Sequence, residues 1–181
     1  MSWLDDAERV DVAVYAAIAQ TPTPALDRAM SRLSQAANYS RLSIASAAVL
    51  GAAGGAKGRR AAAGGLASVA VTSAVVNLLV KPLGRRRRPD RAAQDVPIAR
   101  YVDMPRSSSF PSGHSAAAFA FATGVGRTMP QAAAPLRALA ALVAYSRVHT
   151  GVHYPGDVTI GSLIGSSLAQ ATTRGLERAQ R

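Results

Sequence analysis

The feature that most constrains the fold is an apolar block, Ala61 to Val80, which reads AAAGGLASVAVTSAVVNLLV and contains no charged residue. A helix of about 20 residues is about 30 Å long, which matches the hydrocarbon thickness of a bilayer. The block is rich in Ala, Gly and Ser, the small residues that let helices pack closely in a membrane. Its one strongly polar residue is Asn77. The sequence therefore predicts a membrane-spanning helix here.

Four further apolar segments, shorter or more polar than this block, indicate additional helices. The helices expected after residue 40 span about 41–56, 61–80, 112–128, 132–147 and 156–173. Their connections include KGRR at 57–60 and a long basic segment at 81–111. The alternation typical of β-strands does not occur. The expected fold class is all-α, a transmembrane bundle of about five to six helices, with a soluble helical bundle as the alternative.

The first 40 residues carry two amphipathic patterns in place of apolar blocks. Ser2 is expected to cap the first helix, and Thr23 to cap a second helix that begins at Pro24. Both helices are expected to lie at the membrane interface or against the bundle, with a soluble cap on the bundle as the alternative. The acidic N-terminus lacks the basic start of a secretory signal peptide. The chain is thus divided into amphipathic N-terminal helices, 1–40, and a transmembrane helical core, 41–175, within one domain.

The charge of the chain indicates an anionic partner. Its 21 Lys and Arg residues against 10 acids give a formal net charge of +11 at pH 7. Phosphate, nucleic acid and lipid headgroups are all anions that a chain of positive net charge can attract. The absence of cysteine excludes disulfides, thiolate nucleophiles and cysteine-ligated zinc. The chemistry must therefore come from other residues.

Two short motifs combine cations with a helix start. KPLGRRRRP contains Lys81 and Arg88, although a basic run of this kind is most often a solvated or headgroup-facing surface. PSGH places Ser112, Gly113 and His114 at the start of an apolar helix. A hydroxyl, free backbone N–H groups and the helix dipole can hold an anion there, and a merely capped helix is the simpler interpretation.

A third motif, SRVHTGVHYPGD, contains Arg147, His153 and Asp157. Asp157 is the only acid between Asp103 and Glu177 and opens an otherwise apolar helix, so it needs a partner. His153 is the expected partner, because a carboxylate bonded to one imidazole nitrogen leaves the other nitrogen free as a nucleophile. An Asp cap beside a loop histidine is the alternative.

Together the three motifs resemble the signature motifs of the type 2 phosphatidic acid phosphatase superfamily, which includes lipid phosphate phosphatases and vanadium-dependent haloperoxidases. The resemblance runs over 77 residues, from Lys81 to Asp157, in the family's order. The apolar segments and the N-terminal stretch also resemble the small bacterial membrane members. Joint agreement of this kind is much more specific than any single motif.

The resemblance implies a role for each motif residue. His153 would attack phosphorus to give a phosphohistidine intermediate, Asp157 would steady its imidazolium, and His114 would protonate the leaving oxygen. The groups implied to hold the phosphoryl oxygens are Lys81, Arg88, Ser112, Gly113 and Arg147. Three cations would supply the charge that magnesium supplies in other phosphoryl-transfer enzymes, so neither a metal nor a cofactor is expected.

Some basic residues of these segments receive no such role. His149 matches no fixed motif position and is expected to be a supporting or loop residue. Arg86 and Arg87 are expected to stay on a solvated or headgroup-facing surface.

The expected substrate is a lipid phosphate at a membrane interface. A polyprenyl phosphate or diphosphate is favoured, such as decaprenylphosphoryl-ribose 5-phosphate or undecaprenyl diphosphate, with phosphatidic acid or phosphatidylglycerol phosphate as alternatives. Membrane lipid is a further expected partner, nucleic acid is not, and a homo-oligomer is left open. The expected location is multi-pass in the plasma (inner) membrane. Once Lys81 and Arg88 are assigned to the site, the positive-inside rule weakly favours an extracytoplasmic active site.

Two other functional classes are kept as alternatives. A vanadate-dependent haloperoxidase would share the anion pocket, but those enzymes are soluble. A non-enzymatic basic membrane protein that binds nucleic acid or anionic lipid would need the arginines but not the histidines. Steep salt dependence of binding without phosphate release would favour the second class.

Overall fold

The computed structural model describes residues 3–179, and its regular structure is helical, with no β-strand among those residues. The expected all-α class is confirmed. The helices of at least eight residues are α1 (Trp3–Gln20), α2 (Pro24–Ala36), α3 (Arg41–Ala53), α4 (Gly55–Val75), α6 (Gly113–Thr128), α7 (Pro130–His149) and α8 (Pro155–Ala179). The short elements are the 3-10 turns η1 (Asn38–Ser40) and η3 (Ile98–Arg100), the π-helical turn η2 (Val76–Val80) and α5 (Lys81–Leu83).

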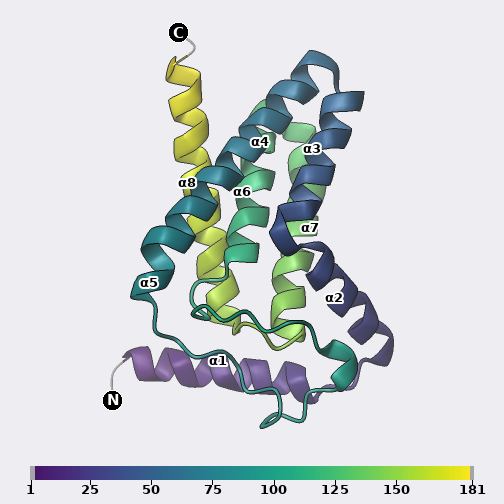
Figure 1. The fold of residues 1–181 in the computed structure, drawn as a ribbon, viewed down its shortest axis with the longest axis vertical. Helices are drawn as coiled ribbons and strands as arrows, with labels where there is room; N and C mark the ends of the chain where they lie inside the picture. Colours follow the sequence, from purple (N-terminus) through teal and green to yellow (C-terminus); the bar gives the residue numbers. More distant parts are fainter. Residues whose placement is uncertain (1–2, 180–181) are drawn as a thin grey trace.

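The core is a bundle with α6 at its centre, since α6 packs against α4, α7 and α8. Helices α3, α4, α6, α7 and α8 run along the long axis of the molecule, whereas α1 lies across one end (Figure 1). The segment between α5 and α6 passes over the same end, next to α1 (Figure 1). The loops that carry the three motifs are therefore gathered at one end of the bundle.

Close contact between α6 and α8 depends on glycine. A Cβ atom at Gly165 would lie 2.0 Å from the carbonyl oxygen of Ala116, which is far inside van der Waals contact. At the motif end of the same pair, the backbone N–H of Ser112 donates to the carbonyl oxygen of Asp157 at 2.9 Å. The two helices thus approach backbone to backbone, and this approach fixes PSGH against the start of α8.

One stretch of the described chain, Gly55–Leu83, is long and apolar enough to cross a membrane by length and composition. It runs through α4, η2 and α5 and contains the predicted helix 61–80, most of whose surface is not buried within the protein. By contrast, α3 and α6 have only 13 and 16 residues. Helices α7 and α8 are long enough, with 20 and 25 residues, but among the described residues only Gly55–Leu83 is both long and apolar enough. The expected bundle of five to six membrane helices therefore rests on the family resemblance and not on the length and composition of the helices.

The connection expected at KGRR, residues 57–60, is wrong. These residues lie inside α4, and the chain turns before them at Gly54 and Gly55. Gly55 has a φ of +60°, a conformation that glycine adopts without a steric cost. Lys and Arg are good helix formers, so nothing in KGRR stops the helix.

The helix caps agree with the sequence in part. Ser112 caps α6, and its hydroxyl accepts the N–H of Ser115 at 3.4 Å. Thr23 does precede Pro24 at the start of α2, but its hydroxyl donates to the Asp27 carboxylate at 2.8 Å and makes no cap bond. Ser2 lies outside the described residues.

Candidate active site

The structure brings all of the predicted site residues to one end of the bundle. Lys81 stands in α5, and Arg88 follows in the loop after it. PSGH opens α6, while the third motif runs from the end of α7 through a turn into α8. Lys81 and Arg88 both donate to the Ser107 hydroxyl, at 3.1 and 3.4 Å, and Arg88 also lies 3.3 Å from His153. The backbone N–H of His153 donates to the carbonyl oxygen of Arg147 at 3.2 Å.

His153 is buried, and its two ring nitrogens face different groups. Nδ1 lies 3.5 Å from Oδ2 of Asp157, as the sequence predicted. Nε2 lies 3.3 Å from Nη1 of Arg88. Because a guanidinium can only donate, Nε2 must offer its lone pair and the ring proton must sit on Nδ1. This tautomer is the one that a nucleophilic Nε2 requires.

The electrostatic surroundings keep His153 uncharged. Burial is the largest influence and disfavours the imidazolium, and the positive charges of Arg88 and Arg147 act in the same direction. Asp157 acts in the opposite direction, but the net result lowers the pKa of His153 to about 4. The ring is therefore neutral at physiological pH and available as a nucleophile.

Asp157 is held by more groups than the sequence indicated. It is fully buried, and its Oδ2 accepts the Ser109 hydroxyl at 2.5 Å and the Tyr154 backbone N–H at 2.9 Å. The Ser109 hydroxyl also lies 3.5 Å from Nδ1 of His153. Ser109 thus bridges the carboxylate and the imidazole. It is the last of three consecutive serines before PSGH, and that run was the available signal in the sequence.

Arg86 is not a solvated residue, so that expectation is wrong. Its Nη1 lies 3.0 Å from Oδ1 of Asp157 and 2.6 Å from Oδ2 of Asp11, which stands on α1. The guanidinium also covers the ring of Tyr154 at 4.3 Å. Burial alone would lower the pKa of Arg86, but the bonds to the two carboxylates outweigh it and the pKa is raised. Arg86 therefore joins α1 to the Asp157 carboxylate.

Arg88 is fixed by backbone carbonyl groups and not by a carboxylate. Its Nη1 donates to the carbonyl of Val152 at 2.7 Å, Nε to that of Ser107 at 3.0 Å, and Nη2 to that of Ser108 at 3.1 Å. Burial is the main reason that the pKa of Arg88 lies below its usual value. Its charge is thus held in place without being neutralised.

The other two cations are also unpaired within the described chain. Lys81 donates to the Ser107 hydroxyl at 3.1 Å. Arg147 is buried, donates from Nη1 to the backbone oxygen of Ser34 at 3.3 Å and to its hydroxyl, and keeps a buried Nε that has no hydrogen-bond partner. Among residues 3–179, neither side chain forms an ion pair with a carboxylate. Ser34, on α2, had no signal in the sequence.

His114 meets a partner that the sequence did not suggest. Its Nε2 lies 2.9 Å from Oδ1 of Asn38 in η1, and the amide oxygen accepts the Nε2 proton. Nδ1 is then the ring nitrogen left for a substrate. Gly113, next along the chain, lies beside Lys81, since a Cβ atom there would be 3.7 Å from Nζ.

A pocket of about 230 Å³ opens next to these groups. Its lining residues are Ala37, Tyr39, Ser40, Leu42, Ser43, Ser73, Asn77, Lys81, Gly113, His114, Ala117, Ala118 and Val143. Lys81, Gly113 and His114 belong both to the motifs and to the lining of this pocket, so the pocket adjoins the candidate site.

His149 is neither a loop residue nor part of this pocket. It lies at the end of α7, buried, with Nε2 2.9 Å from Oδ1 of Asp27. The same carboxylate oxygen accepts Nε of Arg100 at 2.7 Å. This buried cluster joins α2, η3 and α7. Within residues 3–179, no group of three or more His, Asp or Glu side chains is placed to hold a metal ion.

The sequence has named relatives. It is 39% identical over 97 residues to the decaprenylphosphoryl-5-phosphoribose phosphatase of Mycobacterium tuberculosis, in strains CDC 1551 / Oshkosh and ATCC 25618 / H37Rv. The aligned part is 51% of this chain and 49% of the relative. The match thus spans about half the length of these curated relatives.

Two solved structures share the fold. LpxE of Aquifex aeolicus has a TM-score of 0.73 and 23% identity, over 90% of this chain and 94% of that chain. The PAP2-type phosphatidylglycerolphosphate phosphatase of Bacillus subtilis has a TM-score of 0.73 and 23% identity, over 97% of this chain and 88% of that chain. The sequence also matches the PAP2 superfamily over residues 62–181, which include all three motifs. The resemblance seen in the motifs is confirmed, and the chain belongs to the PAP2 superfamily.

Proposed function

We propose that this chain is an integral membrane lipid phosphatase that hydrolyses a phosphomonoester or diphosphate through a phosphohistidine intermediate, without a metal ion. The observation that carries the proposal is the cluster of three cations, Lys81, Arg88 and Arg147, beside His153. Like charges repel, so a cluster without carboxylate partners favours an anion between them. The buried, unpartnered Nε of Arg147 adds a donor suited to a phosphoryl oxygen.

The proposed reaction has two steps. Nε2 of His153 attacks phosphorus, the bond from phosphorus to the leaving oxygen breaks, and His114 in its doubly protonated form gives that oxygen the Nδ1 proton, while its Nε2 proton stays hydrogen-bonded to Asn38. In the second step water attacks the phosphohistidine and gives a proton to Nδ1 of His114. The bond from phosphorus to Nε2 of His153 breaks, and inorganic phosphate is released. Asp157 stabilises the positive charge that develops on the His153 ring. The cations, with the Ser112 hydroxyl and the N-terminus of α6, offset the negative charge on the phosphoryl oxygens.

A polyprenyl phosphate is the proposed class of substrate. The name of the curated Mycobacterium tuberculosis relatives supports a lipid-linked phosphoribose such as decaprenylphosphoryl-ribose 5-phosphate. Undecaprenyl diphosphate, phosphatidic acid and phosphatidylglycerol phosphate are the comparison substrates, because the three motifs contact phosphate and not lipid.

The proposed setting is a multi-pass protein of the plasma membrane with its active site at the extracytoplasmic face. The apolar stretch Gly55–Leu83 supports membrane embedding. If a lipid phosphate enters the protein from the bilayer, its phosphate group would reach the end of the bundle where the motifs lie. We expect detergent to be needed to release the protein from the membrane fraction, and release by simple lysis would contradict this setting.

The test is phosphate release from a panel of purified lipid phosphates by protein in detergent, in the presence of EDTA, with His153→Ala as the inactive control. Hydrolysis should persist in EDTA and be blocked by vanadate, which mimics five-coordinate phosphorus. Activity that is lost on chelation and restored by magnesium or zinc would contradict the metal-free mechanism. No release from any member of the panel would contradict the phosphatase itself.

A further inference from the structure

The pocket of about 230 Å³ continues from the candidate active site on the side where a leaving group would depart. It shares Lys81, Gly113 and His114 with that site. The mechanism uses His114 on the leaving oxygen, so whatever carries the phosphate must occupy the space beyond this side chain. The remaining lining residues therefore contact the leaving group and not the phosphoryl group.

Beyond Lys81 and His114 the wall of this pocket is uncharged and mixed, since it combines hydroxyl and amide side chains with the apolar side chains of Ala37, Leu42, Ala117, Ala118 and Val143. Apart from Lys81 and His114, the lining contains no acid and no base. The hydroxyl and amide side chains that line it are those of Tyr39, Ser40, Ser43, Ser73 and Asn77. Each can both donate and accept hydrogen bonds. Such a wall matches a neutral, hydroxylated group, whereas acyl chains offer nothing for these side chains to bond.

Asn77 is the least expected member of the wall. It is the one strongly polar residue in the apolar block 61–80, and it lies in the π-helical turn η2 immediately before Lys81. Asn77 is exposed, so its amide is free to bond a ligand, and π-turns within helices are frequent at functional sites. Both features are explained by a ligand in the pocket.

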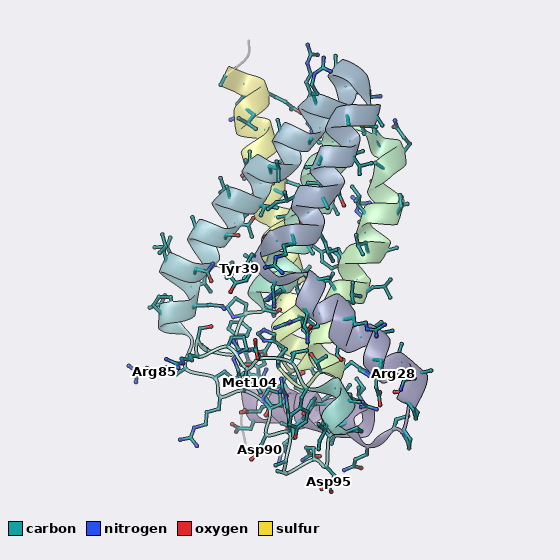
Figure 2. The ribbon with its side chains drawn as sticks, turned by 45° about the vertical axis from the view of Figure 1, so that its right-hand side comes forward. Arg28, Tyr39, Arg85, Asp90, Asp95 and Met104 are labelled. Atoms are coloured by element: carbon teal, nitrogen blue, oxygen red, sulfur yellow. The ribbon has the colours of Figure 1, made fainter. Side chains whose placement is uncertain are left out.

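Part of the pocket lining comes from a strained turn. Tyr39 and Ser40 have φ values of 55° and 56°, the left-handed region that residues other than glycine rarely adopt. Strain of this kind persists where surrounding structure enforces it and is frequent at ligand-binding sites. The turn places Asn38 on His114 and Tyr39 and Ser40 at the pocket. Figure 2 shows Tyr39 at the junction of α2 and α3, above the loop that carries Arg85 and Met104.

The pocket is open to solvent on one side, and its volume of about 230 Å³ is sufficient for one small ring.

We infer that this pocket is a sugar subsite, in which Asn77, Ser73 and Tyr39 bind the hydroxyl groups of a single sugar ring whose phosphate reaches Lys81 and His114. The inference rests on the proposed phosphatase function and identifies the residues that select its substrate. Such a subsite would favour a lipid-linked sugar phosphate as substrate over phosphatidic acid, which has no free hydroxyl group next to its phosphate.

The test compares two soluble phosphates of similar length, ribose 5-phosphate and n-pentyl phosphate, with purified protein in detergent. The wild-type protein should have a higher kcat/KM on ribose 5-phosphate. Asn77→Leu and Tyr39→Phe should each lower the ratio of the two kcat/KM values by about fivefold, the usual size of one lost hydrogen bond. Tyr39 is largely exposed, so its variant should fold normally.

The matched control is Thr172→Val, which removes a hydroxyl from α8 that bonds only its own helix, to the carbonyl of Leu168. It should leave the ratio unchanged. If Asn77→Leu and Tyr39→Phe also leave the ratio unchanged while phosphate is released, the sugar subsite is wrong and the phosphatase stands. If wild-type protein releases phosphate from neither compound nor from the lipid panel, the phosphatase proposal and the subsite both fail.

Discussion

At the scale of single residues, the two histidines of the site differ in the partner that fixes each ring. Asp157 and Ser109 lie at Nδ1 of His153 and leave Nε2 for phosphorus. Asn38 lies at Nε2 of His114 and leaves Nδ1 for the leaving oxygen. The partners thus leave Nε2 of one ring and Nδ1 of the other free to face a substrate. In the proposed mechanism Nε2 of His153 attacks phosphorus, and Nδ1 of His114 gives a proton from the doubly protonated ring.

Removing His114 should have an effect that depends on the leaving group. His114→Ala should slow hydrolysis of a lipid phosphate by about 10²–10⁴-fold, the usual contribution of general acid catalysis. On p-nitrophenyl phosphate the loss should be much smaller, because that leaving group needs little protonation. The measurement is kcat on both substrates. Equal losses would mean that His114 acts through phosphate binding or structure.

The protonation of His153 gives a second residue-scale prediction. Burial disfavours the charged ring, so the folded protein should bind a proton at His153 only as the pH falls toward about 4, below the usual value near 6.5. NMR of protein with labelled histidine should show this titration, assigned by its loss in His153→Ala. A midpoint at 6.5 or above would contradict the burial seen in the structure.

Arg86 should act on the rate through Asp157 and not through substrate binding. Arg86→Gln removes the ion pairs to Asp157 and Asp11, so the His153 ring loses part of its orientation. We expect kcat to fall by about 10-fold to 100-fold, with little change in KM. Arg87→Gln, on an exposed neighbour, is the matched control and should keep both values. A rise in KM with unchanged kcat would place Arg86 in the phosphate pocket instead.

These supporting residues show where prediction from sequence stops. Lys81, His114 and His153 stand in motifs with fixed spacing, so the sequence identified them. Asn38 meets His114 across 76 residues, and Arg86 meets Asp157 across 71. Pairings of that length depend on how the helices pack, and no local pattern encodes them.

At the scale of helices, local signals were sufficient for most boundaries. Apolar blocks and proline positions predicted five core helices, and the bounds of α6 and α7 are within two residues of those expected, because periodicity and start signals act within a few residues. By contrast, α4 begins six residues before the expected start at 61, and α8 ends six residues after the expected end at 173. The error at KGRR also comes from a local signal. The charged run predicted a connection between helices, but the chain turns at Gly55, which has a positive φ.

The α6–α8 contact gives an element-scale prediction. Gly165→Ala should destabilise the protein by about 1–3 kcal/mol, since the new methyl group would meet the backbone of Ala116. Gly175→Ala is the matched control on the same helix. A Cβ there would meet nothing within 4 Å, so this change should be neutral or stabilising. The check is the thermal unfolding midpoint in detergent. Equal midpoints for both variants would contradict the close packing.

At the scale of the whole molecule, the two parts of the chain meet at the candidate site. The bundle supplies the motifs, and the N-terminal helices supply Asp11, Ser34 and Asn38, which contact Arg86, Arg147 and His114. The sequence predicted that those helices lie at the membrane interface or against the bundle, without a role at the candidate site. Their contacts indicate that residues 3–40 orient side chains of the candidate site as well as cover the end of the bundle.

The most direct test of the account is to trap the covalent intermediate. Protein in detergent with EDTA would be mixed with a ³²P-labelled lipid phosphate, quenched within its first turnover, and mapped by mass spectrometry. The account predicts one acid-labile phosphate on His153, absent from His153→Ala and still formed by His114→Ala on an aryl phosphate. Phosphate release without any labelled protein, or label on a residue other than His153, would contradict it.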